Sequence, residues 1–208
     1  MRVFHITADG FVELDGLPEA LPPNGYLWIG SARREFEVQQ AALQAMLARF
    51  TGAPLLDLHV ADLLSNQLPS QHGYTSWYDV LVFRRLAAGP RSSLLFVDEN
   101  RGTATSARQA LDSIDTSPVG FALFDRLLIT VHPTDCQVRE HFASRLATVA
   151  QEPRAEARAS VARLPTSSAD LMLRMVNHMV DSYLDLRRLL TRQLAYLQSE
   201  LLLSLIHI

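Results

Sequence analysis

The pattern of apolar and polar residues in the first two thirds of the chain predicts short strands that alternate with helices. Two apolar runs flank residues 7–10, and the Asp-Gly pair between them is typical of a β-hairpin. Unbroken apolar runs, or runs of aromatic and β-branched residues, predict further strands at 25–31, 77–86 and 93–99. Residues 119–132 predict two more strands, one on each side of Asp125 and Arg126. Apolar residues at helical spacing predict helices at 35–50, 55–65 and 135–151. Helices lying on a mixed sheet give an α/β (α+β) sandwich, which we expect for residues 1–150.

Residues 151–202 have a different pattern, which predicts a polar linker followed by one long helix. Ser167 is placed as the N-cap, with Asp170 three residues later, the spacing of a capping box. A heptad-like apolar seam then runs through Met172, Val176, Met179, Tyr183, Leu186, Leu190, Leu194, Leu197 and Leu201. A helix of this extent is roughly 50 Å long, whereas a compact chain of this size is roughly 43 Å across. We therefore expect a protruding, coiled-coil-like helix whose seam packs on a partner subunit or on a following helix.

Residues 203–208, Leu-Ser-Leu-Ile-His-Ile, end the chain without the Gly, Asn or Pro that commonly follows a helix. The same six residues are the translation of the transposon-end adapter of a common sequencing library. We expect this tail to be derived from the adapter and not to belong to the fold.

Composition narrows the classes of function. The chain has 208 residues, of which 48% are apolar and 20% charged, as in an ordinary globular protein. A net charge of −3 gives no basic footprint for nucleic acid. The sequence contains no lysine, which excludes a Walker-type phosphate loop and a Schiff-base lysine. Cys136 is the only cysteine and the N-terminus lacks a signal-peptide core, so we expect a reducing, cytosolic environment.

Several groups of chemically active residues have simpler structural explanations. One group, which lies close in sequence but not at a zinc-site spacing, consists of His132, Asp135, Cys136 and His141. Asp135 is placed to cap the next helix, and His141 falls on the apolar stripe of that helix. A hydrolase could be drawn from His59, Asp62 and His72 with Ser65 or Ser70, but no nucleophile-elbow motif is present. Met172, Met175 and Met179 suit core packing better than a soft-metal site. We therefore expect no catalytic residues and no enzyme activity.

Asp79 is harder to explain by structure alone, because it lies between apolar neighbours inside a predicted strand. A carboxylate in this position must face solvent, pair with an arginine or contribute to a cation site. All three interpretations stay open on the residues alone.

The order of the motifs resembles that of CorA-family magnesium transporters. The blocks LHVADLLSNQLPS and YTSWYDVLVFRRL, then VGFALFDRLLITVHP, then the long helix with Val180, Asp181 and Tyr183 are similar to successive blocks of that family between residues 20 and 203. The resemblance implies an α/β/α cytosolic domain followed by helices that lead to two transmembrane segments, with a Gly-Met-Asn loop between them. This chain lacks that loop and any membrane span, so we expect it to be a fragment truncated before the stalk and transmembrane helices.

The resemblance also implies a function. The full-length protein would be a homopentamer in the inner (plasma) membrane that takes up Mg²⁺, Co²⁺ or Ni²⁺, and this segment would be the ion-sensing domain on its cytoplasmic side. Asp79 falls where the family's strand carries a carboxylate of a regulatory Mg²⁺ site, whose other half would come from the missing stalk helix. Two alternatives stay open: the zinc-transporting branch of the same family, and a soluble module that dimerises through the long helix.

Overall fold

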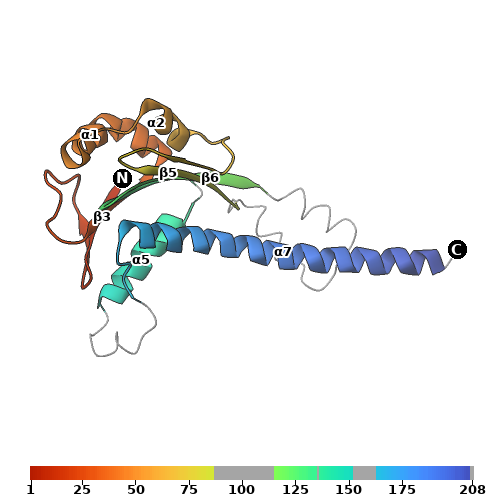
Figure 1. Cartoon of the computed structure of the whole chain (residues 1–208). Helices are drawn as coiled ribbons and strands as arrows, with labels where there is room; N and C mark the ends of the chain where they lie inside the picture. Colours follow the sequence, from red (N-terminus) through yellow and green to blue (C-terminus); the bar gives the residue numbers. More distant parts are fainter. Residues whose placement is uncertain (87–114, 135, 152–162, 207–208) are drawn as a thin grey trace. The chain divides into compact units, whose positions relative to one another are not determined.

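A computed structural model of the chain describes residues 1–86, 115–134, 136–151 and 163–206 (Figure 1). The predicted strand at 93–99, the linker at 152–162 and Asp135 lie outside these ranges. The elements, in chain order, are β1 (Arg2–Ile6), β2 (Phe11–Leu14), β3 (Tyr26–Ala32), α1 (Arg33–Thr51), α2 (Asp57–Leu64), β4 (Gln71–Tyr74), β5 (Asp79–Leu86), β6 (Thr116–Phe124), β7 (Leu127–His132), α5 (Val138–Gln151) and α7 (Ser168–Ile206).

The strands form one seven-stranded sheet in the order β2-β1-β3-β7-β6-β5-β4. The pairs β1–β2, β1–β3, β4–β5 and β6–β7 are antiparallel, whereas β3 and β7 run parallel with Gly30 opposite Thr130. A parallel pair requires a long crossover connection, and here α1 and α2 lie in the chain between β3 and β7. The mixed sheet with covering helices confirms the predicted fold class.

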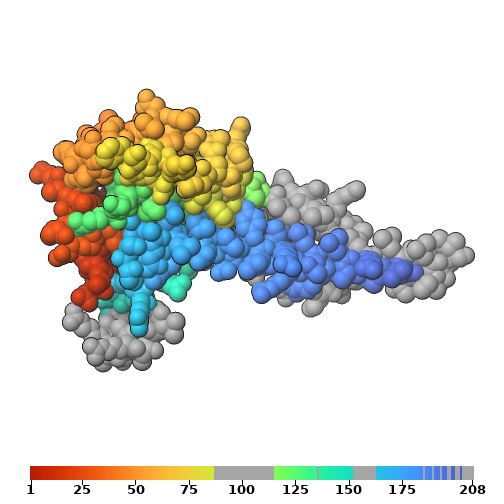
Figure 2. All heavy atoms as spheres, in the orientation of Figure 1, coloured from red at the N-terminus to blue at the C-terminus, as the bar shows by residue number. Residues whose placement is uncertain are grey.

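Helices α1 and α2 cover one face of the sheet and enclose the main apolar core with it. The buried stripe of α1 consists of Phe36, Leu43, Met46 and Leu47. These residues recur at the helical spacing that the sequence shows. Figure 2 shows the outer surface of this helical layer in orange, beside the yellow atoms of the β4 region. The layer is held close to the sheet at Gly120, because a Cβ there would lie 2.7 Å from Leu63 Cδ2.

The opposite face is covered by α5 and by the first turns of α7 (Figure 1). Helix α5 buries Val138, Phe142, Ala143 and Leu146. His141 is exposed and contacts the ring of Phe142 edge-on, so its predicted place on the apolar stripe is wrong. The reason is that Phe142 and Leu146 centre the stripe, and successive residues of a helix point about 100° apart.

The start of α7 confirms Ser167 as the cap, whereas the Asp170 carboxylate binds the backbone of the residue before Ser167 and does not complete a capping box. Asp170 N donates to Ser167 Oγ at 3.1 Å, and the Asp170 carboxylate accepts from Thr166 N at 3.0 Å. The fully buried side chains of the first turns are Leu171 and Met175, one position before Met172 and Val176, which are half-buried. The predicted seam is wrong in this segment, because a helix that packs on a sheet buries a wider stripe than a coiled-coil seam.

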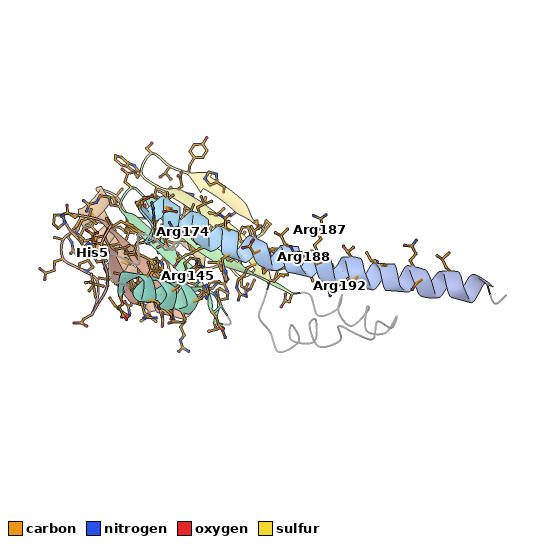
Figure 3. All side chains as sticks on the ribbon, turned by 90° about the horizontal axis from the view of Figure 1, so that it is seen from below. His5, Arg145, Arg174, Arg187, Arg188 and Arg192 are labelled. Carbon is orange, nitrogen blue, oxygen red and sulfur yellow. The ribbon has the colours of Figure 1, made fainter. Side chains whose placement is uncertain are left out.

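The chain divides into two compact units, residues 1–84 with 118–176 and residues 85–117 with 177–208. We call residues 1–84 with 118–176 the sheet unit, and the sites discussed below lie within it. In the other unit, the side chains of Arg187, Arg188 and Arg192 are exposed along α7 (Figure 3). Within the described ranges, no helix combines the length and the apolar character needed to span a bilayer.

Glu35, in the first turn of α1, joins three parts of the sheet unit. Its carboxylate accepts from Ala32 N at 2.9 Å, contacts the Met1 ammonium at 2.8 Å and pairs with Arg139 at 3.2 Å. Burial is the largest single influence and raises the pKa of Glu35. The hydrogen bonds from the ammonium and from Ala32, with the charges of the ammonium and Arg139, together outweigh it and lower the pKa to about 2.

We expect Glu35→Gln to lower the free energy of unfolding by about 1 kcal/mol at neutral pH, a value kept small because the side chain is 41% exposed. Because the folded-state pKa is depressed, the wild-type advantage is complete above the ordinary value of 4.5 and is lost as the pH falls to about 2. Urea unfolding of both proteins across this range measures the difference. A difference that stays constant with pH would contradict the assignment.

Candidate functional site

Asp79 is the first residue of β5, directly after a tight turn formed by residues 75–78. Thr75 organises this turn: its Oγ1 accepts from Trp77 N at 3.1 Å and from Tyr78 N at 3.0 Å, and donates to Tyr78 O at 2.9 Å. Thr75 N also donates to Tyr78 O at 2.9 Å. Asp79 is exposed and pairs in register with Tyr74 of β4. The turn therefore fixes the backbone from which the Asp79 carboxylate projects.

Asp125 lies in the tight turn between β6 and β7, and this turn is held by both of its flanks. Ser168 Oγ, at the start of α7, lies 2.7 Å from Phe124 O and 3.0 Å from Asp125 O, to which it donates. Arg126 donates from Nε to Gly25 O at 2.9 Å and from its guanidinium to Pro22 O. The Asp125 side chain is exposed on a backbone that is anchored to two other parts of the chain.

Asp79 and Asp125 line the same open pocket, which has a volume of about 320 Å³. The other polar lining groups belong to Thr75, Ser76, Tyr78, Ser167 and Ser168, and the pocket has no arginine or histidine in its lining. Among the described residues, neither carboxylate takes part in an ion pair or a hydrogen bond. The two acidic side chains are therefore left uncompensated, and the pocket favours a cation over an anion.

Carboxylate and hydroxyl oxygens are the ligands of hard cations such as Mg²⁺, which binds to one or two carboxylates and keeps several of its waters. The two carboxylates of this pocket fit such an ion, whereas Thr75 Oγ1 and the Tyr78 hydroxyl are already hydrogen-bonded within the chain. Across the parts of the chain that the structure describes, however, no group of three or more His, Cys, Asp or Glu side chains is placed to hold a metal. The pocket alone therefore offers part of a coordination shell.

Among the described residues, no hydrogen bond joins Ser65 or Ser70 to His59 or His72, so the hydrolase considered from the sequence has no nucleophile bonded to a base. His59 Nδ1 lies 2.9 Å from the hydroxyl of Tyr78, which also accepts from Leu56 N at 2.9 Å. Burial raises the pKa of Tyr78, so this hydroxyl stays protonated at neutral pH. The candidate nucleophiles have other partners: Ser65 Oγ accepts from Gln67 N at 3.3 Å, and Ser70 Oγ accepts from Arg84 N at 3.0 Å.

The second cluster of the sequence is brought together only in part. His132 is buried at the end of β7 and lies 3.5 Å from Cys136, whereas His141 is exposed on α5. Of the three methionines, Met175 is fully buried and Met172 half-buried in the sheet unit, and Met179, in the other unit, is 2% exposed.

Asp125 was not predicted as a site residue. In the sequence, Asp125 and Arg126 indicate only a reversal between strands, because a polar pair between apolar runs is typical of a turn. The available signal was topological: the ends of β5 and β6 are neighbours only if these strands are adjacent in the sheet, as they are here.

No protein-family model and no curated protein sequence matches the chain. Solved structures do match it. The soluble domain of CorA from Methanocaldococcus jannaschii has a TM-score of 0.55 and 14% identity, over 96% of this chain and 64% of that one. The ZntB cytoplasmic domain from Vibrio parahaemolyticus has a TM-score of 0.50 and 13% identity, over 89% of this chain and 60% of that one.

The complete CorA magnesium transporter from Methanocaldococcus jannaschii gives a TM-score of 0.56 and 15% identity, over 97% of this chain and 50% of that one. The chain thus spans between half and 64% of the length of these relatives in structure. With a seven-stranded mixed sheet, helices on both of its faces and a long final helix, the chain has the fold of the CorA soluble domain.

Proposed function

We propose that this chain is the cytosolic ion-sensing domain of a CorA-like membrane transporter that takes up Mg²⁺, and that Asp79 contributes to a regulatory Mg²⁺ site. The observation that carries the proposal is the pocket in which Asp79 and Asp125 stand together without a basic partner. The fold shared with the CorA soluble domain supports it, because the matches extend over nearly the whole chain. The chain itself would not conduct ions; the pore would belong to a membrane part of the full-length protein, assembled as a homopentamer.

Transport through such a protein needs no nucleotide. A divalent ion that moves down a membrane potential of 100 mV gains about 4.6 kcal/mol, twice the value for one elementary charge. This agrees with a sequence that has no lysine for a phosphate-binding loop.

The proposed sensor works by a shift of populations. Cytosolic Mg²⁺ stabilises the closed transporter only if it binds that state more tightly than the open one. Asp79 and Asp125 supply two carboxylates from the sheet unit, and a neighbouring subunit completes the coordination shell in the closed state. When the cytosolic Mg²⁺ concentration falls, the ion dissociates. The two unshielded carboxylates then no longer bind the neighbouring subunit through the ion, and the closed state loses this stabilisation.

In the full-length protein, we expect Asp79→Asn to raise, by about tenfold, the Mg²⁺ concentration at which uptake falls to half. The reason is that the loss of one charged ligand removes at least about 1.4 kcal/mol of the free energy of Mg²⁺ binding. Ion uptake into proteoliposomes at a series of internal Mg²⁺ concentrations measures this shift. Asp15→Asn is the matched control, because Asp15 is equally an exposed aspartate but does not line the pocket. Identical Mg²⁺ dependence in all three proteins would show that Asp79 has no regulatory role.

The likeness to the ZntB cytoplasmic domain favours a second candidate, a zinc transporter with the same sensing domain. Genomic DNA beyond the codon for residue 202 decides the class. Two apolar stretches of about 20 residues each, separated by Gly-Met-Asn, are expected for a transporter of either kind. A gene that ends near residue 203 would instead favour a soluble module that dimerises through α7. Uptake of Mg²⁺ against Zn²⁺ by the full-length protein then separates the two transporters.

A further inference from the structure

The start of α7 forms part of the wall of the pocket that holds Asp79 and Asp125. Ser167, Ser168 and Ala169 line this pocket together with the two carboxylates. The first turns of α7, up to residue 176, belong to the sheet unit. The helix therefore borders the candidate site directly, and no other element lies between them.

Ser168 makes the contact between α7 and the turn that carries Asp125. Its side chain is 2% exposed, and its hydroxyl lies 2.7 Å from Phe124 O and 3.0 Å from Asp125 O. Burying a hydroxyl costs free energy unless the hydroxyl is hydrogen-bonded, and alanine would fill nearly the same space without that cost. Packing alone therefore gives no reason for a serine at this position, whereas its hydrogen bonds to the turn do.

The hydroxyl of Ser168 has one proton for these two carbonyl oxygens. A serine hydroxyl rotates and donates a single hydrogen bond, so the proton can point to Phe124 O, to Asp125 O or between them. The bond from the helix can thus shift along the turn without breaking. A ligand that binds the Asp125 carboxylate favours the arrangement to which it binds most tightly.

The turn and the helix are each anchored by other contacts, so Ser168 links two separately held parts. On the far side of the turn, Arg126 Nε donates to Gly25 O at 2.9 Å. Within α7, the Asp170 carboxylate pairs with Arg174, one helical turn later, at 3.0 Å. Among the described residues, no other hydrogen bond joins α7 to the β6–β7 turn. Loss of this one hydroxyl would therefore leave the turn and the helix without a hydrogen bond between them.

We propose that Ser168 is a positioning residue that couples occupancy of the pocket to the first turn of α7. This inference rests on the proposed function, in which Asp79 and Asp125 bind a cation. Ser168 holds the turn in the arrangement that presents the Asp125 carboxylate, and the bound cation in turn stabilises the hydrogen bond from Ser168. The coupling is reciprocal, because a contact that strengthens cation binding is strengthened by the cation to the same degree. The stability of the first turn of α7 is then the output of the sensor.

Mg²⁺ alone is the probe, added as the chloride to the intact folded chain at constant ionic strength. The fluorescence of Trp77 follows binding, because Trp77 lines the pocket and is 64% exposed, whereas Trp28, the other tryptophan, is fully buried. Amide hydrogen exchange in the first turns of α7 measures the stability of the helix start. In the wild type, we expect saturating Mg²⁺ to slow this exchange about threefold, the effect of one modest hydrogen bond.

Ser168→Ala is expected to weaken Mg²⁺ binding about threefold and to abolish the effect of Mg²⁺ on exchange in α7. A serine that served only the fold would instead raise the exchange rate equally with and without Mg²⁺. Met172→Ala is the matched control, because it removes uncharged, half-buried packing from the same turns of α7 and lies outside the pocket lining. We expect this control to raise exchange in α7 but to keep the wild-type affinity for Mg²⁺ and the threefold protection.

The outcomes separate the failure of this inference from that of the proposed function. If Asp79→Asn and the wild type give the same Trp77 titration, the pocket is not the cation site, and both proposals are overturned. If Mg²⁺ binds in the pocket but Ser168→Ala keeps the affinity and the protection of the wild type, only the coupling is overturned. Circular dichroism shows whether each variant is folded. If Ser168→Ala does not fold, exchange in the wild type decides, because α7 amides that Mg²⁺ does not protect would overturn the coupling.

Discussion

Replacing Gly25 by alanine is expected to lower the free energy of unfolding by about 3 kcal/mol or more, enough to unfold a marginal domain. Gly25 has a φ of 72°, which costs a residue with a Cβ about 1–2 kcal/mol. In addition, that Cβ would lie 2.1 Å from the backbone oxygen of Ile6. The oxygen belongs to β1, which is paired on both sides, so it cannot move away without loss of the ladder.

Gly52→Ala is the matched control for this prediction. Gly52 ends α1 with a φ of 80°, but a Cβ there would meet no atom within 4 Å. We expect it to cost only about 1 kcal/mol, the backbone contribution alone. Urea unfolding of both variants measures the two values. Equal losses at the two positions would show that the contact with Ile6 does not limit the fold.

Gly25 also connects the fold to the candidate site. Its carbonyl oxygen accepts from Arg126 Nε, and Arg126 follows Asp125 in the β6–β7 turn. A shift of the backbone at Gly25 therefore moves the anchor of one of the two carboxylates in the pocket. A folded Gly25 variant would be expected to bind cations more weakly even though residue 25 does not line the pocket.

The strands and helices that sequence reasoning recovered are those with a strong local signal. The aromatic and β-branched run at the start of β5 and the unbroken apolar run of β7 each indicate a strand without reference to the rest of the chain. The start of α7 is equally local, because Ser167 Oγ accepts from Asp170 N and the Asp170 carboxylate accepts from Thr166 N. In these segments propensity, pattern and tertiary packing agree.

Strand β4 was not predicted, because its residues Gln71–Tyr74 are polar or lack a side chain. It exists because it pairs with β5, in a register that sets Tyr74 opposite Asp79. An edge strand of this kind is specified by its neighbour and has no pattern of its own. The same limit applies to His141, whose orientation depends on which face of α5 meets the sheet.

The candidate site was half predictable for a related reason. Asp79 is conspicuous in the sequence, because a carboxylate within an apolar strand needs an explanation. Asp125 is an ordinary turn residue until the sheet order places β5 beside β6 and Ser168 fixes the turn from α7. The hydrogen bond from Trp28 to Thr130 is likewise invisible in sequence, since these two residues meet only through the parallel pairing of β3 and β7.

The contact of α2 with β6 should show strong coupling between Leu63 and Gly120. Leu63→Ala is expected to lower the free energy of unfolding by about 2–5 kcal/mol, because the side chain is 1% exposed and leaves a cavity. Gly120→Ala is expected to cost about 1–3 kcal/mol, since its Cβ would lie 2.7 Å from Leu63 Cδ2 and 3.2 Å from Leu63 Cα.

In the double variant the methyl group of Ala at position 120 enters the space that the Leu63 side chain has left. The combined loss should therefore fall short of the sum of the single losses by about 1 kcal/mol or more. Urea unfolding of the four proteins of this cycle measures the coupling. Because Leu63 Cα is also close, part of the cost of Gly120→Ala should persist in the double variant. Additive losses would mean that backbone proximity alone, and not the Leu63 side chain, requires glycine at this point of β6.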